Sequence, residues 1–337
     1  MVKFNVKHGL LLAALVALAA ARSASASAPK AISRVESDRR LYAAWTVKAA
    51  QVLVARADAN SLATAAALRA AGSPPKADSS KSDPGALELA ARAGELAPQS
   101  AAIGWLRLQL CAHSTACDIR DTATVMRWVD PDNGAAWLPT LAAAQRDRDT
   151  TEVDRVLADM ARTNRFDLYW NRIVVLMCDA LDAVRNELPG GYAASDSARY
   201  ATVSGAAAGE VIPPFAPLTD ACRESISLPE RRELCLELSK TMQRSDTIAA
   251  QLAGFSIERR LLGPESKEAR AIAEKKHVLE WRAAAADKVD RPLLPWTKNA
   301  RSRARIMEMR ARPREEDVCI ATLRAHKMPL DPPEVHP

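Results

Sequence analysis

The chain has 337 residues, of which 48% are hydrophobic and 26% are charged, and its formal net charge is +6. These values are typical of a globular protein and exclude a chain that is disordered throughout. Glycine accounts for only 12 residues and aromatic residues for 4% of the chain, whereas alanine is unusually abundant. Because alanine favours helices and disfavours strands, the composition predicts an all-α protein.

The first 26 residues have the layout of a secretory signal peptide. Two lysines give a basic start, residues 9–21 are uncharged but too few to span a membrane comfortably, and small residues follow at 24–28. This order predicts export with cleavage after Ala26, the alternative being an uncleaved anchor. The bacterial periplasm is the compartment that the signal and the Ala/Arg-rich composition favour. Residues 1–28 carry three bases and no acid, so their loss lowers the net charge from +6 to +3 and leaves no case for a nucleic acid partner.

All six cysteines follow this segment, and an even number in an oxidising compartment predicts disulfides. Their spacing favours two local pairs, Cys111–Cys117 and Cys222–Cys235, each at a connection between helices. Cys178 and Cys319 remain, either as a third pair or as two buried thiols. Metal binding and redox catalysis are weaker interpretations, because the chain has no C-x-x-C motif and no histidine at ligand spacing from a cysteine.

Hydrophobic periodicity and turn residues divide the rest of the chain into helices. Residues 31–71 are expected to be helical and to end at a Pro/Ser-rich linker. The next segment is expected to hold helices at 84–97, 100–112, 120–129, 134–146, 151–164 and 167–188. Pro139 is expected to kink the helix that contains it. Further helices are expected at 195–209, 218–225, 229–244, 246–262, 265–288, 296–312 and 315–327.

Proline, glycine and serine clusters mark the expected boundaries, because these residues interrupt helices. The resulting parts are a signal peptide (1–26), N-terminal helices with a linker (27–82), helical repeats (83–188), a Gly/Pro-rich connection with a short helix (189–217), a C-terminal helical domain (218–328) and a loose Pro-rich tail (329–337).

Tryptophans recur at a fixed interval within the segment of expected repeats. Trp105, Trp137 and Trp170 are separated by 32 and 33 residues, and Pro98 and Pro131 by 33. A period of about 34 residues with two helices per period is typical of stacked helical hairpins. We expect the indoles to be wedges in the core rather than the lining of a ligand groove, because core packing already explains regular spacing.

The same segment, about residues 84–188, resembles tetratricopeptide repeats. The stretch from Asp130 to Leu138 is similar to the family's turn into its first helix, and Trp105 keeps the family's aromatic-x-x-aliphatic step. The pattern departs from the family at Trp137, where Thr140 occupies the aliphatic position. The resemblance implies an α-α superhelix of stacked hairpins, followed here by a second helical domain. Such a superhelix offers an extended surface to a protein or peptide.

No combination of residues predicts catalysis, a cofactor or a metal. The step from Glu274 to His277 is a single Glu-x-x-His, whereas a di-metal bundle needs two of them with further glutamates. The stretch from Asp130 to Gly134 is similar to the start of a calcium loop, but its glycine comes one position early and Leu141 stands where a glutamate is needed. We therefore interpret that stretch as a turn.

The C-terminal helices are basic, with 18 Lys/Arg against 11 Asp/Glu in residues 255–327. The densest stretch holds Lys298, Arg301, Arg303, Arg305, Arg310, Arg312 and Arg314. One interpretation is a contact with an anionic partner, such as phospholipid headgroups or an acidic protein. The other is a solvated basic face whose apolar side packs on the domain.

These observations predict an exported binding or scaffold protein that presents a helical-repeat surface to another protein or a peptide. A cell-envelope enzyme with an unrecognised site is one alternative. A membrane-surface protein that acts through residues 298–314 is the other.

Overall fold

The computed structural model describes residues 28–72, 83–188, 196–224, 228–290 and 300–333. These ranges form α-helices and one short 3-10 helix without a β-strand, which confirms the predicted all-α class. None of the helices in these ranges combines the length and the apolar composition that crossing a membrane requires. The predicted signal peptide and most of the linker before residue 83 lie outside the described residues. The chain divides into two compact units, 1–45 and 46–337, and apart from residues 28–45 every feature discussed below lies in the second.

The segment predicted to be helical over 31–71 forms two helices, α2 (Ala28–Arg56) and α3 (Ala59–Gly72). Ala57 adopts a left-handed backbone with φ 57°, which an α-helix does not allow. Asp58 then caps α3, because its carboxylate accepts hydrogen bonds from the backbone N–H and the hydroxyl of Ser61 at 2.9 and 2.8 Å. The predicted helical character is confirmed, and the position of the break was not predicted because this N-cap went unrecognised.

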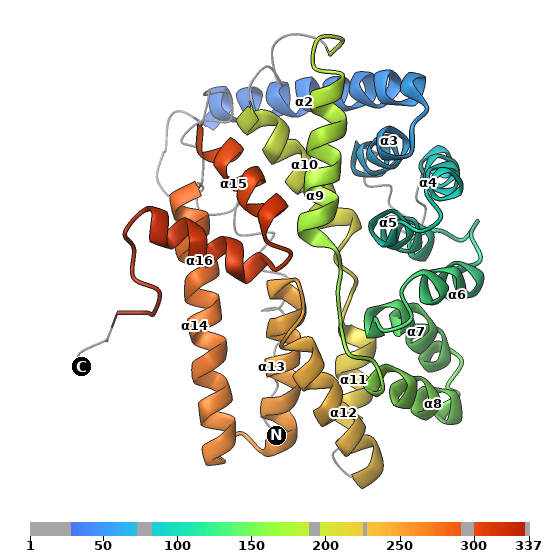
Figure 1. Cartoon of the computed structure of the whole chain (residues 1–337), viewed down its shortest axis with the longest axis vertical. Helices are drawn as coiled ribbons and strands as arrows, with labels where there is room; N and C mark the ends of the chain where they lie inside the picture. Colours follow the sequence, from blue (N-terminus) through green and yellow to red (C-terminus); the bar gives the residue numbers. More distant parts are fainter. Residues whose placement is uncertain (1–27, 73–82, 189–195, 225–227, 291–299, 334–337) are drawn as a thin grey trace. The chain divides into compact units, whose positions relative to one another are not determined.

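A row of short helices follows, in which each packs on the next along the chain (Figure 1). Its members are α4 (Pro84–Leu96), α5 (Ala101–Ala112), α6 (Ile119–Val129), the 3-10 helix η2 (Gly134–Trp137), α7 (Leu138–Arg146) and α8 (Thr150–Ala161). Five of these helices begin at a side chain that accepts a backbone N–H from the first turn: Asp83, Ser100, Asp118, Asn133 and Asp149. The predicted breaks therefore lie where capping residues stand.

Pro139 does not kink a continuous helix over 134–146, contrary to expectation. The segment is split into η2 and α7, and Pro139 lies in the first turn of α7. The first N–H groups of a helix have no partner within the helix, so the N–H that proline lacks costs α7 no hydrogen bond.

The remaining helices pack beside this row. α9 (Trp170–Ala183) packs on α3, α5, α10 (Asp196–Glu210) and α15 (Ala300–Ala311), as Figure 1 shows. α8 packs on α12 (Pro229–Met242), and α11 (Ala216–Glu224) packs on α7 and α13 (Ile248–Leu262). The row and the C-terminal helices therefore belong to the same packed unit.

The C-terminal helices have a core of their own. Side chains such as Phe255 on α13, Leu279 on α14 (Lys267–Asp290) and Leu323 on α16 (Glu315–Ala325) are buried together. The segment predicted to be a loose tail begins against this core: Arg282 donates to the Leu330 carbonyl at 2.9 Å and to the Asp331 carboxylate at 3.2 Å. The start of the tail is therefore held in place.

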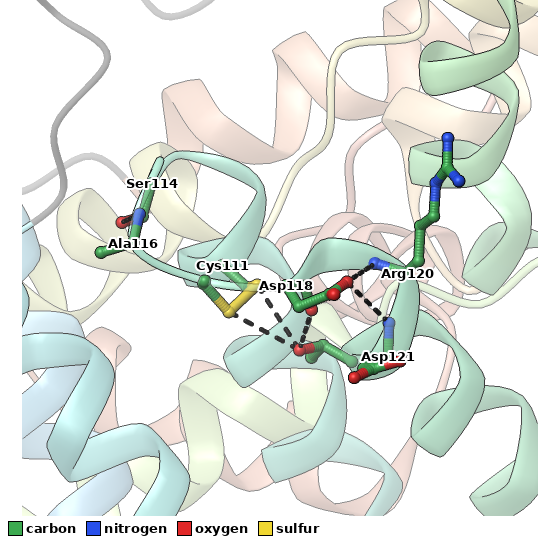
Figure 2. The surroundings of a disulfide bond; sticks show 8 residues. Cys111, Ser114, Ala116, Asp118, Arg120 and Asp121 are labelled. Carbon is green, nitrogen blue, oxygen red and sulfur yellow. Dashed lines mark hydrogen bonds between the residues drawn. A yellow bond between two sulfur atoms is a disulfide. The ribbon is translucent and has the colours of Figure 1, made fainter.

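Two disulfides link neighbouring helices at the predicted positions, Cys111 with Cys117 and Cys222 with Cys235. The first closes the connection from α5 to α6, where the Asp118 carboxylate also accepts the first N–H groups of α6 (Figure 2). In the loop-entropy model the two bonds stabilise the fold by about 2 and about 3 kcal/mol. The other two cysteines, Cys178 and Cys319, are buried thiols, so the second of the two alternatives holds.

Candidate functional site

The three evenly spaced tryptophans lie in different surroundings. Trp105 on α5 is fully buried, and its Nε1–H donates to the Val211 carbonyl at 3.0 Å. Trp137 and Trp170 are only half-buried. The expectation of core wedges is confirmed for Trp105, whereas Trp137 and Trp170 lie at the margin of the core, because equal spacing along the chain does not place the indoles at equal depth.

Trp137 instead lies beneath charged side chains. The Arg127 guanidinium on α6 stands 4.2 Å from its ring centroid, and that of Arg155 on α8 stands 5.8 Å away. Arg155 also forms ion pairs with Glu152 at 2.6 Å and with Asp159 at 2.7 Å. These cation–π contacts connect α6, η2 and α8 at the surface.

The most exposed large apolar side chain described is Trp128 on α6. Its residue is 87% exposed, and Val125, three residues earlier on the same helix face, is 50% exposed. The opposite face of α6 is buried through Thr122, Ala123 and Met126. We call the pair Trp128 and Val125 the α6 face. The sequence prediction missed it, because Trp128 lies outside the tryptophan period.

The end of α6 is fixed by a buried polar cluster. Asp130 accepts hydrogen bonds from the Arg165 guanidinium and from the Tyr169 hydroxyl. The side-chain amide of Asn133 donates to the Tyr169 hydroxyl at 3.0 Å and to the Asp167 carbonyl at 2.9 Å, and its oxygen accepts the N–H groups of Ala135 and Asp167. Protein donors occupy the side-chain oxygens of Asp130 and Asn133, so the stretch from Asp130 to Gly134 is a turn, as interpreted from the sequence.

The cluster continues into the C-terminal helices through Asp246. Its carboxylate accepts the Leu168 N–H at 2.7 Å, and its carbonyl accepts the Glu315 N–H at 2.8 Å. Glu315 in turn accepts the N–H of Ile248 at 2.9 Å. Burial and, next, the neighbouring Asp167 carboxylate together raise the pKa of Asp246 to about 7. The cluster therefore joins the row of short helices to α13 and α16.

The basic residues predicted to contact an anionic partner do not share one open face. Lys298 and the side chain of Arg301 lie outside the described residues. Arg305 turns toward Thr322 and Cys319 on α16, Arg312 pairs with Glu308, and Arg314 pairs with Glu316. Arg303 and Arg310 remain, and both line a cavity between α9, α10 and α15.

This cavity has a volume of about 130 Å³ and is lined by three arginines. Arg199 from α10 joins Arg303 and Arg310 from α15, and the rest of the lining is Cys178, Asp182, Ile306 and Met307. Arg199 is only 4% exposed and lies 3.2 Å from the Asp182 carboxylate. Burial and, next, the nearby carboxylates of Asp182 and Asp179 raise the pKa of the Cys178 thiol to about 12. This thiol is therefore neutral and a poor nucleophile.

Comparison of the chain with protein-family models, with curated proteins and with solved structures found no match. The α6 face and the cavity between α9, α10 and α15 are therefore the candidate functional sites.

Proposed function

We propose that the protein is an exported binding or scaffold protein of the bacterial periplasm, and that it presents a tetratricopeptide-like row of helices to another protein or a peptide. The observation that carries this proposal is the α6 face, where an indole is 87% exposed beside a half-exposed valine. Tryptophan is among the residues that contribute most to binding energy at protein interfaces, because it combines a large apolar area with few rotatable bonds.

The α6 face is held rigidly, which favours binding. The Cys111–Cys117 disulfide and the Asp118 cap fix the start of α6 (Figure 2). At the other end, Asp130 is held by Arg165 and Tyr169. A partner therefore meets a preformed surface and loses little free energy to ordering it.

Two disulfides support the exported location. Disulfides persist in oxidising compartments and are rare in the bacterial cytoplasm. N-terminal sequencing of the protein from a periplasmic extract tests this part. We expect the mature chain to begin after Ala26, and an intact Met1 on protein retained in the cytoplasm contradicts it.

Photo-crosslinking in living cells tests the binding role. A photoreactive amino acid at Val125 is expected to capture a protein or peptide, identified by mass spectrometry. Trp128→Ala in the same background is expected to abolish that capture. Leu228→Ala is the matched control, because Leu228 is another exposed apolar residue and lies before α12. Absence of any captured partner, or equal capture by Trp128→Ala and wild type, contradicts the proposal.

A further inference from the structure

Beyond the proposed function, we propose that the cavity between α9, α10 and α15 binds a phosphate group. A free phosphate ion and the headgroup of an anionic phospholipid share this chemistry. The site uses Arg199, Arg303 and Arg310, which converge on one cavity from two helices.

Arginines outnumber carboxylates in the lining of the cavity by three to one. Four guanidinium groups lie at or beside it, those of Arg185, Arg199, Arg303 and Arg310. Among the described side chains, Asp182 pairs with Arg185 and Arg199, and Asp179 pairs with Arg310. The described lining therefore favours an anionic ligand.

Arg303 is the residue with which the anion is expected to pair. Within the part of the chain that the structure describes, Arg303 forms no ion pair, whereas Arg199 and Arg310 each hold an aspartate. A guanidinium group offers a planar fork of N–H donors that matches two phosphate oxygens. The neutral Cys178 thiol in the same lining adds no negative charge to repel the ligand.

The size of the cavity limits the ligand. A volume of about 130 Å³ suits a phosphate group. Pockets for drug-sized molecules start at about 300 Å³. A nucleotide or a larger cofactor therefore does not fit inside. Met307, which is 57% exposed, and Ile306 lie on the same helix beside the arginines, so a lipid headgroup can enter with apolar contact next to it.

Titration of the mature full-length protein with inorganic phosphate, followed by calorimetry, tests the site. We expect the wild type to bind phosphate and Arg303→Ala to lose at least about tenfold in affinity. Arg303→Lys is expected to lose less, because lysine keeps the positive charge but lacks the planar fork of N–H donors. Arg162→Ala is the control and is expected to leave affinity unchanged, since Arg162 is exposed on the surface of α8 and pairs with Asp159. Circular dichroism checks that each variant folds, and Arg303 is exposed enough for its replacement to be tolerated.

Co-sedimentation with vesicles separates the two sources of phosphate. The vesicles contain phosphatidylglycerol, or phosphatidylcholine alone as the uncharged reference. Calorimetric binding of inorganic phosphate that depends on Arg303 assigns the site to the free ion. Arg303-dependent binding to phosphatidylglycerol vesicles, without binding of inorganic phosphate, assigns it to the headgroup. If neither probe binds, or if binding is the same for Arg303→Ala and wild type, the inference is overturned.

Discussion

The row of helices from α4 to α8 and the group formed by α9, α10 and α15 are built from different kinds of contact. In the row, each helix packs on its neighbour along the chain. In the group, contacts join distant segments: Arg310 on α15 pairs with Asp179 on α9, 131 residues away. The row presents an exposed indole on a surface made by local contacts, whereas the group encloses a cationic cavity that exists only after distant helices have packed. A local pattern can predict the helices of the row, but not which residues its surface exposes or where the cavity forms.

The largest effect is expected from the residue that joins the two regions. Trp105 on α5 is fully buried and donates to the Val211 carbonyl just after α10. Trp105→Ala removes a large core side chain and leaves a cavity, so it is expected to lower the free energy of unfolding by about 3–5 kcal/mol, measured by urea denaturation.

Trp128→Ala is the matched control for this substitution. Because Trp128 is exposed, its replacement is expected to change the free energy of unfolding by less than about 0.5 kcal/mol. Equal decreases in the free energy of unfolding of the two variants contradict the assignment of Trp105 to the core and Trp128 to the surface.

The next effect concerns the buried cluster that connects the row to α13 and α16. The folded-state pKa of Asp246 is about 7, above the value of about 4 in an unfolded chain. Between these values the folded state binds more protons, so the stability from this group is present at low pH and is lost as pH rises toward 7. The neighbouring Asp167 and Glu315 carboxylates, whose pKa values burial also raises, act in the same direction.

Asp246→Asn sharpens this prediction, since asparagine does not titrate and keeps an oxygen for the Leu168 N–H. Between pH 4 and pH 8 the free energy of unfolding of the wild type is expected to fall by on the order of 3 kcal/mol, and that of the variant to fall much less. Denaturation of both proteins across this pH range measures the difference. Parallel curves for the two proteins show that Asp246 is ionised in both states and contradict the prediction.

The two disulfides are expected to differ in the stability they contribute. Cys222–Cys235 joins residues 13 apart and Cys111–Cys117 residues 6 apart, so replacing both cysteines by alanine is expected to cost about 3 and about 2 kcal/mol respectively. Urea denaturation of the two double variants measures the difference. A larger cost for the shorter loop contradicts the loop-entropy argument for this protein.

Much of the helix pattern could be predicted from residues that act locally. Asp83 and Asp149 accept N–H groups of the turn they precede, so their effect on a helix end is visible within four residues. The two disulfides join cysteines that flank a short connection and could be predicted for the same reason. The break at Ala57 was missed although the signal, an aspartate three residues before a serine, is present in the sequence.

The candidate sites could be predicted only in part. Arg303 and Arg310 were identified from their density of charge, but nothing in the sequence relates them to Arg199, because α10 and α15 are separated by more than eighty residues. The exposure of Trp128 was missed because indoles are usually buried at least in part and this one falls outside the repeat period. Both failures concern tertiary packing, which decides what a residue faces.

The smallest effect is expected at the surface of the row, where Arg155 links α8 to Trp137. Arg155→Ala removes two ion pairs between exposed side chains and a cation–π contact at 5.8 Å. Water and salt screen such contacts, so the free energy of unfolding is expected to fall by less than about 1 kcal/mol, and by less still in high salt.

Arg127→Ala is the comparison, because the Arg127 guanidinium lies closer to the Trp137 ring at 4.2 Å, is less exposed and also donates to Thr140 at 3.2 Å. Its cost is expected to exceed that of Arg155→Ala in urea denaturation at both salt concentrations. A larger cost for Arg155→Ala means that α8, rather than α6, holds Trp137 in place, and that the contacts of the row are less local than its helix order indicates.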